Sequence, residues 1–152
     1  MMREPVETPP DTGTDTDAIP AGYTVLERGG VYFQALGPLY QRVAEDGTLV
    51  IAVRVADKHA NLLGVAHGGM LMTLADSAMG INVGLARPGS QAAQSSVTTM
   101  LSNEFLSPAR IGDWLEARTR IRRNGQRVVF VDCTLTVGER EVMHSSGTFL
   151  PI

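Results

Sequence analysis

Apolar and polar residues alternate with a period of two over several stretches of this 152-residue chain. Such alternation predicts β-strands, because successive side chains of a strand point to opposite faces. Asp46-Gly47 and Asn124-Gly125 stand between two such stretches, and these dipeptides favour tight hairpin turns. Gly138-Glu139-Arg140 predicts a further turn. The predicted strands span residues 39–44, 48–55, 95–106, 114–122, 127–137 and 142–150.

One longer stretch, residues 64–86, is apolar almost throughout and predicts a buried helix that Arg87-Pro88-Gly89 ends. A helix that is apolar nearly all round must be wrapped by the sheet to bury its surface. This arrangement, an antiparallel sheet around one long central helix, is the α+β architecture called a hotdog fold. An open sheet also leaves edge strands, which a second subunit commonly covers by pairing.

The beginning of the chain differs from the rest. Residues 1–20 combine four prolines and five acidic residues with few large apolar ones, so we expect a disordered tail. Residues 21–152 are expected to form one domain without internal repeats.

Charge and composition narrow the classes of partner. A net charge of −3 and only 5% aromatic residues argue against nucleic-acid binding. The apolar stretch contains Asp76 at mid-span, which argues against a membrane helix. The start of the chain lacks the basic and apolar regions of a secretory signal, so a cytoplasmic location is expected. The single cysteine, Cys133, rules out an internal disulfide and is interpreted as a core residue.

The start of the predicted helix is a candidate oxyanion site. Gly68 and Gly69 lack side chains there, and their backbone N–H groups are free to approach a ligand. The alternative is that the glycines only permit a sharp turn. Asp76 lies further along, on a narrow polar stripe with Thr73 and Ser77. A buried carboxylate there suits a general base, although neighbouring hydroxyls could simply satisfy it.

Geometry separates these two candidates within one chain. Asp76 follows Gly68 by eight residues, which is about 12 Å along a helix. One carboxylate therefore cannot act on a carbonyl held by the amides of its own helix. If both belong to one site, a second chain must run antiparallel, so that a two-fold dimer contains two shared sites.

The spacing N-x2-G-x2-HGG-x4-LAD, from Asn61 to Asp76, resembles the PaaI-like group of hotdog-fold acyl-CoA thioesterases. The likeness extends to residues 103–113 and 147–149. It implies hydrolysis of a coenzyme A thioester to a carboxylic acid and free CoA, in dimers that often pair into tetramers with sites composed across the dimer interface.

The resemblance also assigns roles. Asp76 matches the catalytic carboxylate, acting as nucleophile or as general base, and Gly68 matches the oxyanion-hole amide. Asn61 and His67 match positions that orient the thioester or the water, and Thr99 falls where related proteins place a water-orienting hydroxyl. No cofactor is implied, because CoA is part of the substrate. Three histidines, without a histidine or cysteine partner at ligand spacing, predict no metal site.

The phosphates of CoA need cations, and the second hairpin offers several. Besides the amide of Gly69, the candidate CoA-binding residues are Arg122, Arg123, Asn124, Gly125 and Arg127. An ordinary solvated hairpin would have the same composition.

Two alternatives to a thioesterase remain. One is a hydratase or dehydratase acting on acyl thioesters, which generally uses a catalytic histidine in a pattern that this chain lacks. The other is a non-catalytic acyl-CoA binder or sensor, and the joint presence of Asp76, Asn61 and the two glycines counts against it.

Overall fold

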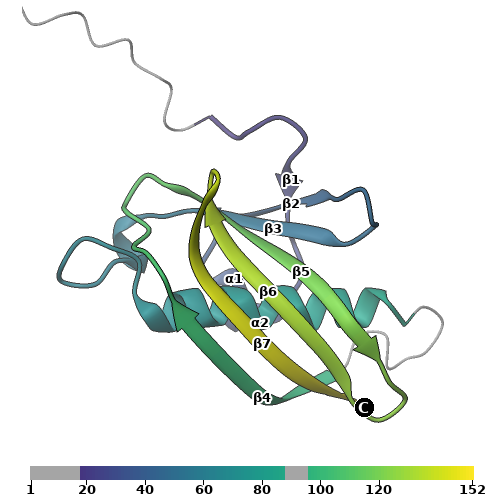
Figure 1. Ribbon diagram of the computed structural model, residues 1–152. Coiled ribbons are helices and arrows are strands. Elements are labelled where there is room, and N and C mark those ends of the chain that lie inside the picture. The colour runs from purple at the N-terminus through teal and green to yellow at the C-terminus, as the bar shows by residue number, and fades with distance from the viewer. Residues whose placement is uncertain (1–17, 88–95) are drawn as a thin grey trace, which may run out of the picture.

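One antiparallel sheet curves around one long helix in the computed structural model, which describes residues 18–87 and 96–152 (Figure 1). The long helix α2 spans Gly68–Leu85, and two short helices, α1 (Gly30–Gln34) and η1 (Asp57–His59), precede it. Seven strands follow one another across the sheet in the order β1-β2-β3-β5-β6-β7-β4. They are β1 (Thr24–Val25), β2 (Leu39–Val43), β3 (Leu49–Arg54), β4 (Ser96–Phe105), β5 (Trp114–Asn124), β6 (Val129–Val137) and β7 (Arg140–Pro151). The predicted hotdog fold is confirmed.

Strands β2 to β7 lie where the alternating pattern predicts them, with shifts of a few residues at their ends. The pattern gave no expectation for residues 21–36, where β1 and α1 form, because two and five residues are too short to show a period. Residues 1–17 of the expected tail and Pro88-Gly89, the expected helix stop, lie outside the described residues.

Helix α2 is buried on three sides and uncovered on the fourth. His67 is the N-cap, and its Nδ1 accepts a hydrogen bond from the Gly69 N–H at 2.9 Å. The buried positions are Met70, Leu71, Leu74, Ala75, Ala78, Met79, Asn82, Val83 and Gly84. The stripe from Met72 to Ile81 that includes Asp76 is only partly covered. None of the described helices is long and apolar enough to cross a membrane.

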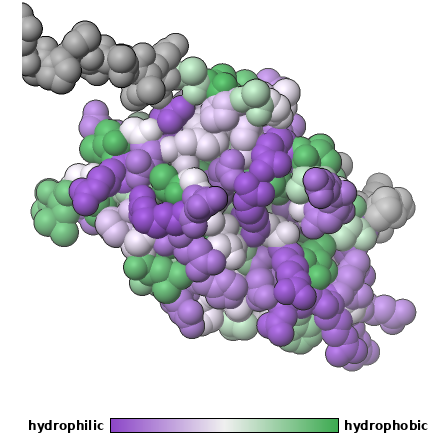
Figure 2. All heavy atoms as spheres, turned by 45° about the horizontal axis from the view of Figure 1, so that its top comes forward, coloured by the Kyte–Doolittle hydropathy of each residue, from purple (hydrophilic) through white to green (hydrophobic). Residues whose placement is uncertain are grey.

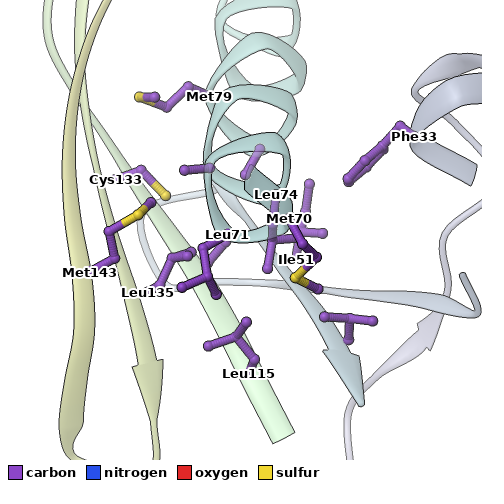
Figure 3. Packing of buried hydrophobic residues seen from close by; sticks show 14 of the residues in the cluster. Phe33, Ile51, Met70, Leu71, Leu74, Met79, Leu115, Cys133, Leu135 and Met143 are labelled. Atoms are coloured by element: carbon purple, nitrogen blue, oxygen red, sulfur yellow. The ribbon is translucent and has the colours of Figure 1, made fainter. Parts of the chain in front are cut away.

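The core lies between α2 and the concave face of the sheet. Figure 3 shows Leu71 and Leu74 of α2 beside Leu115 and Leu135 of the sheet, with Phe33 of α1 on the other flank of the helix. These side chains are at most 4% exposed. Because α1 contributes Phe33 to the same core, this short helix is fixed against α2.

Cys133 lies in this core and is fully buried. Burial raises the pKa of its thiol to about 12, and the nearby Thr119 only partly offsets the effect. We therefore expect the folded protein to show no reaction with 5,5′-dithiobis(2-nitrobenzoate) at pH 8, and one thiol to react after unfolding in guanidinium chloride. Rapid reaction of the native protein would contradict the buried position.

Candidate active site

The carboxylate of Asp76 lies on the uncovered side of α2 and contacts edge strand β4. Thr98 Oγ1 donates a hydrogen bond of 2.6 Å to Asp76 Oδ1. The sequence predicts a buried carboxylate. In a single chain, however, Asp76 is only half-buried, because it lies on the side of α2 that the sheet does not cover. The second carboxylate oxygen, Oδ2, has no partner among the described residues.

Thr99, the expected water-orienting hydroxyl, is not the residue that contacts Asp76. A β-bulge interrupts the pairing of β4 with β7 between Thr98 and Met100. Thr99 lies at this bulge and turns toward β7, where its hydroxyl contacts the carbonyl oxygen and the hydroxyl of Thr148. In this structure Thr98, and not the expected Thr99, therefore contacts Asp76, since an extra residue in a strand changes which side chains face inward.

The amide of Gly68 is available at the start of α2. Gly69 donates its N–H to His67 Nδ1, so that amide is engaged. The Gly68 N–H has no partner in the described part of the chain, as expected at the first turn of a helix. The ring of Phe105, from the end of β4, lies beside Gly68, and a Cβ on Gly68 would be 3.4 Å from it. The structure thus places the predicted oxyanion amide next to an aromatic wall.

Asn61 organises the loop that leads into this turn. Its Oδ1 accepts hydrogen bonds from the backbone N–H groups of Leu63 (2.9 Å) and Val65 (3.4 Å). Its backbone N–H donates to the Val65 carbonyl, and Gly64 supplies the positive φ of 72° that the tight turn needs. The Asn61 Nδ2 has no partner within the described residues, so it is free to donate to a ligand.

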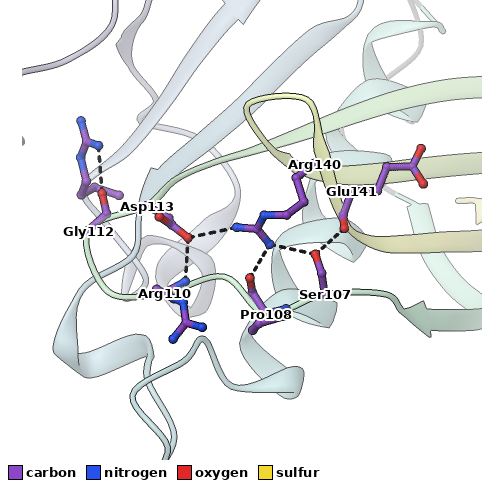
Figure 4. Close-up of polar contacts among 8 residues, drawn as sticks. Ser107, Pro108, Arg110, Gly112, Asp113, Arg140 and Glu141 are labelled. Atoms are coloured by element: carbon purple, nitrogen blue, oxygen red, sulfur yellow. Dashed lines mark hydrogen bonds and ion pairs between the residues drawn. The ribbon is translucent and has the colours of Figure 1, made fainter.

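Arg140 supports the same turn from a distance. Its guanidinium donates to the Ser107 hydroxyl, to the Pro108 carbonyl and, at 3.5 Å, to Asp113 Oδ2 (Figure 4). These contacts hold loop 106–113, whose Ala109 carbonyl accepts the N–H of Ala66, just before His67. No sequence pattern indicates this role of Arg140, because the role depends on contacts between residues about 30 positions apart.

The predicted CoA-binding hairpin is tied to the end of α2. Arg87 donates to Asn124 Oδ1 and to the Gly125 carbonyl, each at 2.8 Å. Arg122 forms an ion pair of 3.5 Å with Asp132. Arg123 and Arg127 are exposed and have no ion pair among the described residues. Two arginines are therefore free to meet a phosphate, whereas Asn124 and Gly125 position the hairpin through Arg87, which sequence reasoning missed.

A cavity of about 520 Å³ opens beside Asp76 and follows α2 toward its C-terminal end. It lies between the uncovered stripe of α2, the loop before α1, strand β4 and the ring of Phe149. Its lining consists of Arg28, Gly29, Gly30, Asp76, Ser77, Gly80, Ile81, Gly84, Leu85, Ser96, Thr98 and Phe149. Gly68 and Asn61 do not line it, so one chain brings Asp76 together with Thr98 but not with the oxyanion amide.

His59 anchors the loop before α2 and is 2% exposed. Its Nδ1 accepts the Ala56 N–H at 2.9 Å, and its Nε2 donates to the Leu36 carbonyl at 2.7 Å. Its own carbonyl accepts the His67 N–H at 2.8 Å. The neutral ring fits these contacts, since a protonated Nδ1 could not accept. Burial, with a smaller effect from Lys58, holds the pKa of His59 below its ordinary value.

This lowered pKa predicts acid sensitivity of the fold. Between the lower folded pKa and the unfolded value near 6.5, the unfolded chain binds more protons, so stability falls as pH drops. We expect the free energy of unfolding to fall more steeply from pH 7 to 5 in the wild type than in His59→Gln, by up to about 1.4 kcal/mol per pH unit. Urea unfolding at several pH values measures this, with His144→Gln as the control. Parallel curves for wild type and His59→Gln would contradict it.

Comparison with known proteins assigns the family. The sequence model of the thioesterase superfamily matches residues 63–144, which is more than half of the chain and includes both Gly68 and Asp76. The chain belongs to the thioesterase superfamily. The protein PA0474 of Pseudomonas aeruginosa, whose name assigns it provisionally to the esterases, is 40% identical over 131 residues, covering 86% of this chain and 96% of that protein. Mouse acyl-coenzyme A thioesterase 13 is 30% identical over 107 residues, covering 65% of this chain and 74% of that protein.

Solved structures of the family share the fold. The BH2602 protein from Bacillus halodurans, solved with CoA, is 27% identical with a TM-score of 0.72 and covers 83% of this chain and 82% of that one. The E. coli PaaI protein from the phenylacetic acid degradation operon gives a TM-score of 0.60 at 24% identity, covering 68% and 72% of the two chains. The resemblance to hotdog-fold thioesterases is confirmed, and the chain is a thioester hydrolase.

Proposed function

We propose that the protein is an acyl-CoA thioesterase that hydrolyses a coenzyme A thioester to a carboxylic acid and free CoA. The observation that carries the proposal is the Asp76 carboxylate, held at one oxygen by Thr98 and open at the other, at the edge of a cavity large enough for an acyl group. A relative named as an acyl-coenzyme A thioesterase and a family structure solved with CoA support the choice of thioester.

The active unit is a two-fold dimer with shared sites. Edge strand β4 has no neighbour on its outer side among the described strands, so it can pair with the β4 of a second copy. Along β4, Thr98 contacts Asp76 and Phe105 lies beside Gly68. An antiparallel β4 pair with Thr98 level with the second copy's Phe105 therefore also places Asp76 level with the second copy's Gly68. The pairing of the two β4 strands and the alignment of the two α2 helices thus require the same two-fold axis.

In such a site each group has a defined task. The second copy's Gly68 N–H donates to the thioester carbonyl oxygen, and the positive end of the helix stabilises the charge that develops there. Acting as general base, Asp76 takes a proton from water, and the hydroxide attacks the carbonyl carbon. The C–S bond then breaks, and the departing CoA thiolate takes the proton from the Asp76 carboxyl group. Asn61 Nδ2 and His67, from the same turn as Gly68, orient the thioester or the water.

Asp76 could instead attack the carbonyl carbon itself, with expulsion of CoA and later hydrolysis of the mixed anhydride. A single turnover in H₂¹⁸O separates the two routes. Direct attack by water puts the label into the carboxylic acid product and none into the protein. Attack by Asp76, followed by hydrolysis of the anhydride at the Asp76 carboxyl carbon, leaves the first acid unlabelled and puts the label into the protein, so labelled protein identifies the covalent route.

Arg123 and Arg127 bind the phosphates of CoA at the rim of the β5–β6 hairpin. Both are exposed, and neither has an ion pair among the described residues, so they are available without breaking an existing contact. Arg122 contributes less, because it already pairs with Asp132.

Thiol release from a panel of acetyl-, hexanoyl-, octanoyl-, benzoyl- and phenylacetyl-CoA tests the proposed function. Turnover of at least one acyl-CoA is expected. No turnover together with measurable CoA binding would favour a sensor, and formation of a hydrated acyl-CoA from an enoyl-CoA would favour a hydratase. Either result would overturn the proposal.

A further inference from the structure

Leu62 and Leu63 are exposed on a loop that is held by internal hydrogen bonds. Their relative exposures are 105% and 84%, the largest of any leucines in the described chain. Asn61 and a backbone bridge between Ala60 and Ala66 hold the loop in one conformation. Figure 1 shows it beyond the start of α2, at the left edge of the ribbon, and Figure 2 shows hydrophobic spheres at that edge. Two adjacent leucines fixed in solvent indicate a contact that a single chain does not make.

The geometry of the proposed dimer locates that contact. When Gly68 of one copy is level with Asp76 of the other, each residue further back along the first chain is level with a residue further forward on the second α2. The three residues from Gly68 back to Val65 extend by up to about 10 Å. Gly80 and Gly84 lie about 6 and 12 Å beyond Asp76. The leucines at the tip of the loop therefore reach the part of the second copy where its cavity opens.

We propose that Leu62 and Leu63 of each copy close the cavity beside Asp76 of the other and thereby determine which acyl groups are hydrolysed. The proposal rests on the shared-site thioesterase proposed above. Each active site then takes its carboxylate and cavity floor from one chain, and its oxyanion amide and the cover of its acyl pocket from the other.

The lining of the cavity indicates the class of acyl group. Along α2 beyond Asp76 and Ser77, its floor is Gly80, Ile81, Gly84 and Leu85, and one wall is the ring of Phe149. Arg28, Ser96 and Thr98 make other parts of the lining polar. A Cβ on Gly80 would lie 3.5 Å from that ring, so even a small side chain at this position would enter the space between helix and ring. An apolar floor covered by two leucines suits an apolar acyl group of several carbons, aliphatic or aromatic. Acetyl would leave most of the cavity empty.

Leu62→Ala, Leu63→Ala and the double variant test this cover. We expect kcat/KM for octanoyl-CoA or phenylacetyl-CoA, whichever the wild type prefers, to fall about tenfold in the double variant, because apolar contact with the acyl group is lost. Hydrolysis of acetyl-CoA should change less than twofold. Val43→Ala is the matched control, since Val43 is 68% exposed on the opposite edge region of the sheet, in β2.

Mixed dimers show whether the leucines act on the site that contains Asp76 of their own chain (in cis) or on the site that contains Asp76 of the other chain (in trans). Asp76→Asn removes the carboxylate, and Gly68→Pro removes the proposed oxyanion amide. When these two chains pair, the one intact site takes its carboxylate from the Gly68→Pro chain. Its Gly68 amide and Asn61–Gly64 loop come from the Asp76→Asn chain. Leu62→Ala/Leu63→Ala should therefore shift the acyl preference only when present in the Asp76→Asn chain. A shift caused from the Gly68→Pro chain would show that the leucines act in cis and would overturn the proposal.

Other results also decide the matter. An unchanged ratio of octanoyl-CoA to acetyl-CoA turnover in the double variant would overturn the proposed cover while leaving the thioesterase function standing. Equal loss on all substrates, together with dissociation to monomers in sedimentation, would show that the leucines hold the dimer and do not select the acyl group. Absence of turnover by the wild type on every acyl-CoA would instead overturn the proposed function itself.

Discussion

Asp76→Asn is expected to lower kcat for acyl-CoA hydrolysis by roughly a thousandfold, within the 10²–10⁴ range of a lost general base. The amide cannot take a proton from water and cannot attack a carbonyl carbon. Its shape nonetheless matches the carboxylate, and its oxygen can still accept the hydrogen bond from Thr98 Oγ1. Substrate affinity and the melting temperature should therefore change little. Steady-state kinetics by thiol release and thermal unfolding measure the two effects.

Asp46→Asn is the matched control. Asp46 lies in the exposed β2–β3 turn, where its carboxylate accepts hydrogen bonds from the backbone and hydroxyl of Thr48. The same change of Asp to Asn there should leave kcat within a factor of two. Undiminished turnover by Asp76→Asn would remove this carboxylate from the mechanism.

Two inactive variants are expected to restore activity to each other when mixed. Gly68→Pro removes the N–H proposed to hold the oxyanion, and the added Cβ would lie 3.4 Å from the Phe105 ring, within ordinary van der Waals contact. Proline is favourable at the first position of a helix, and His67 before it has φ −63° and ψ 137°, a conformation that a following proline permits. Alone, this variant should lose about 10²–10³-fold in kcat.

After Asp76→Asn and Gly68→Pro chains are unfolded together and refolded, half of the dimers contain one chain of each kind. One of the two sites in each mixed dimer then carries an intact Asp76 and an intact Gly68. The mixture should regain about a quarter of wild-type activity. Refolding each variant alone is the control. A mixture no more active than its components, or an active monomer in sedimentation, would show that the sites are not shared.

The parts of the site that lie on a regular helix or strand could be predicted from the sequence, because side chains recur there with a fixed period. The apolar stretch 64–86 predicted the helix, and the eight-residue spacing from Gly68 to Asp76 then gave the distance between these two candidate groups. The alternation along β5 and β6 predicted two strands of the sheet. The exposure of Asp76 could not be predicted, because it depends on which side of α2 the sheet leaves open.

Residues that act through long-range contacts were missed for a common reason. Arg87 and Arg140 are ordinary arginines in the sequence, and only the fold brings them to Asn124 and to loop 106–113. The resemblance pointed to Thr99 and not to Thr98, and alternation could assign a face to each only if the strand stayed regular. The bulge before Met100 breaks that condition, and no residue type in this segment marks it.

That bulge also determines what β4 can touch. Thr98 and Phe105 are seven positions apart, an odd number, so a regular strand would point them to opposite faces of the sheet. The extra residue reverses the phase once, and both side chains face α2, one at Asp76 and the other at Gly68. A single irregularity thus allows one edge strand to support the carboxylate at one level of the helix and the amide at another.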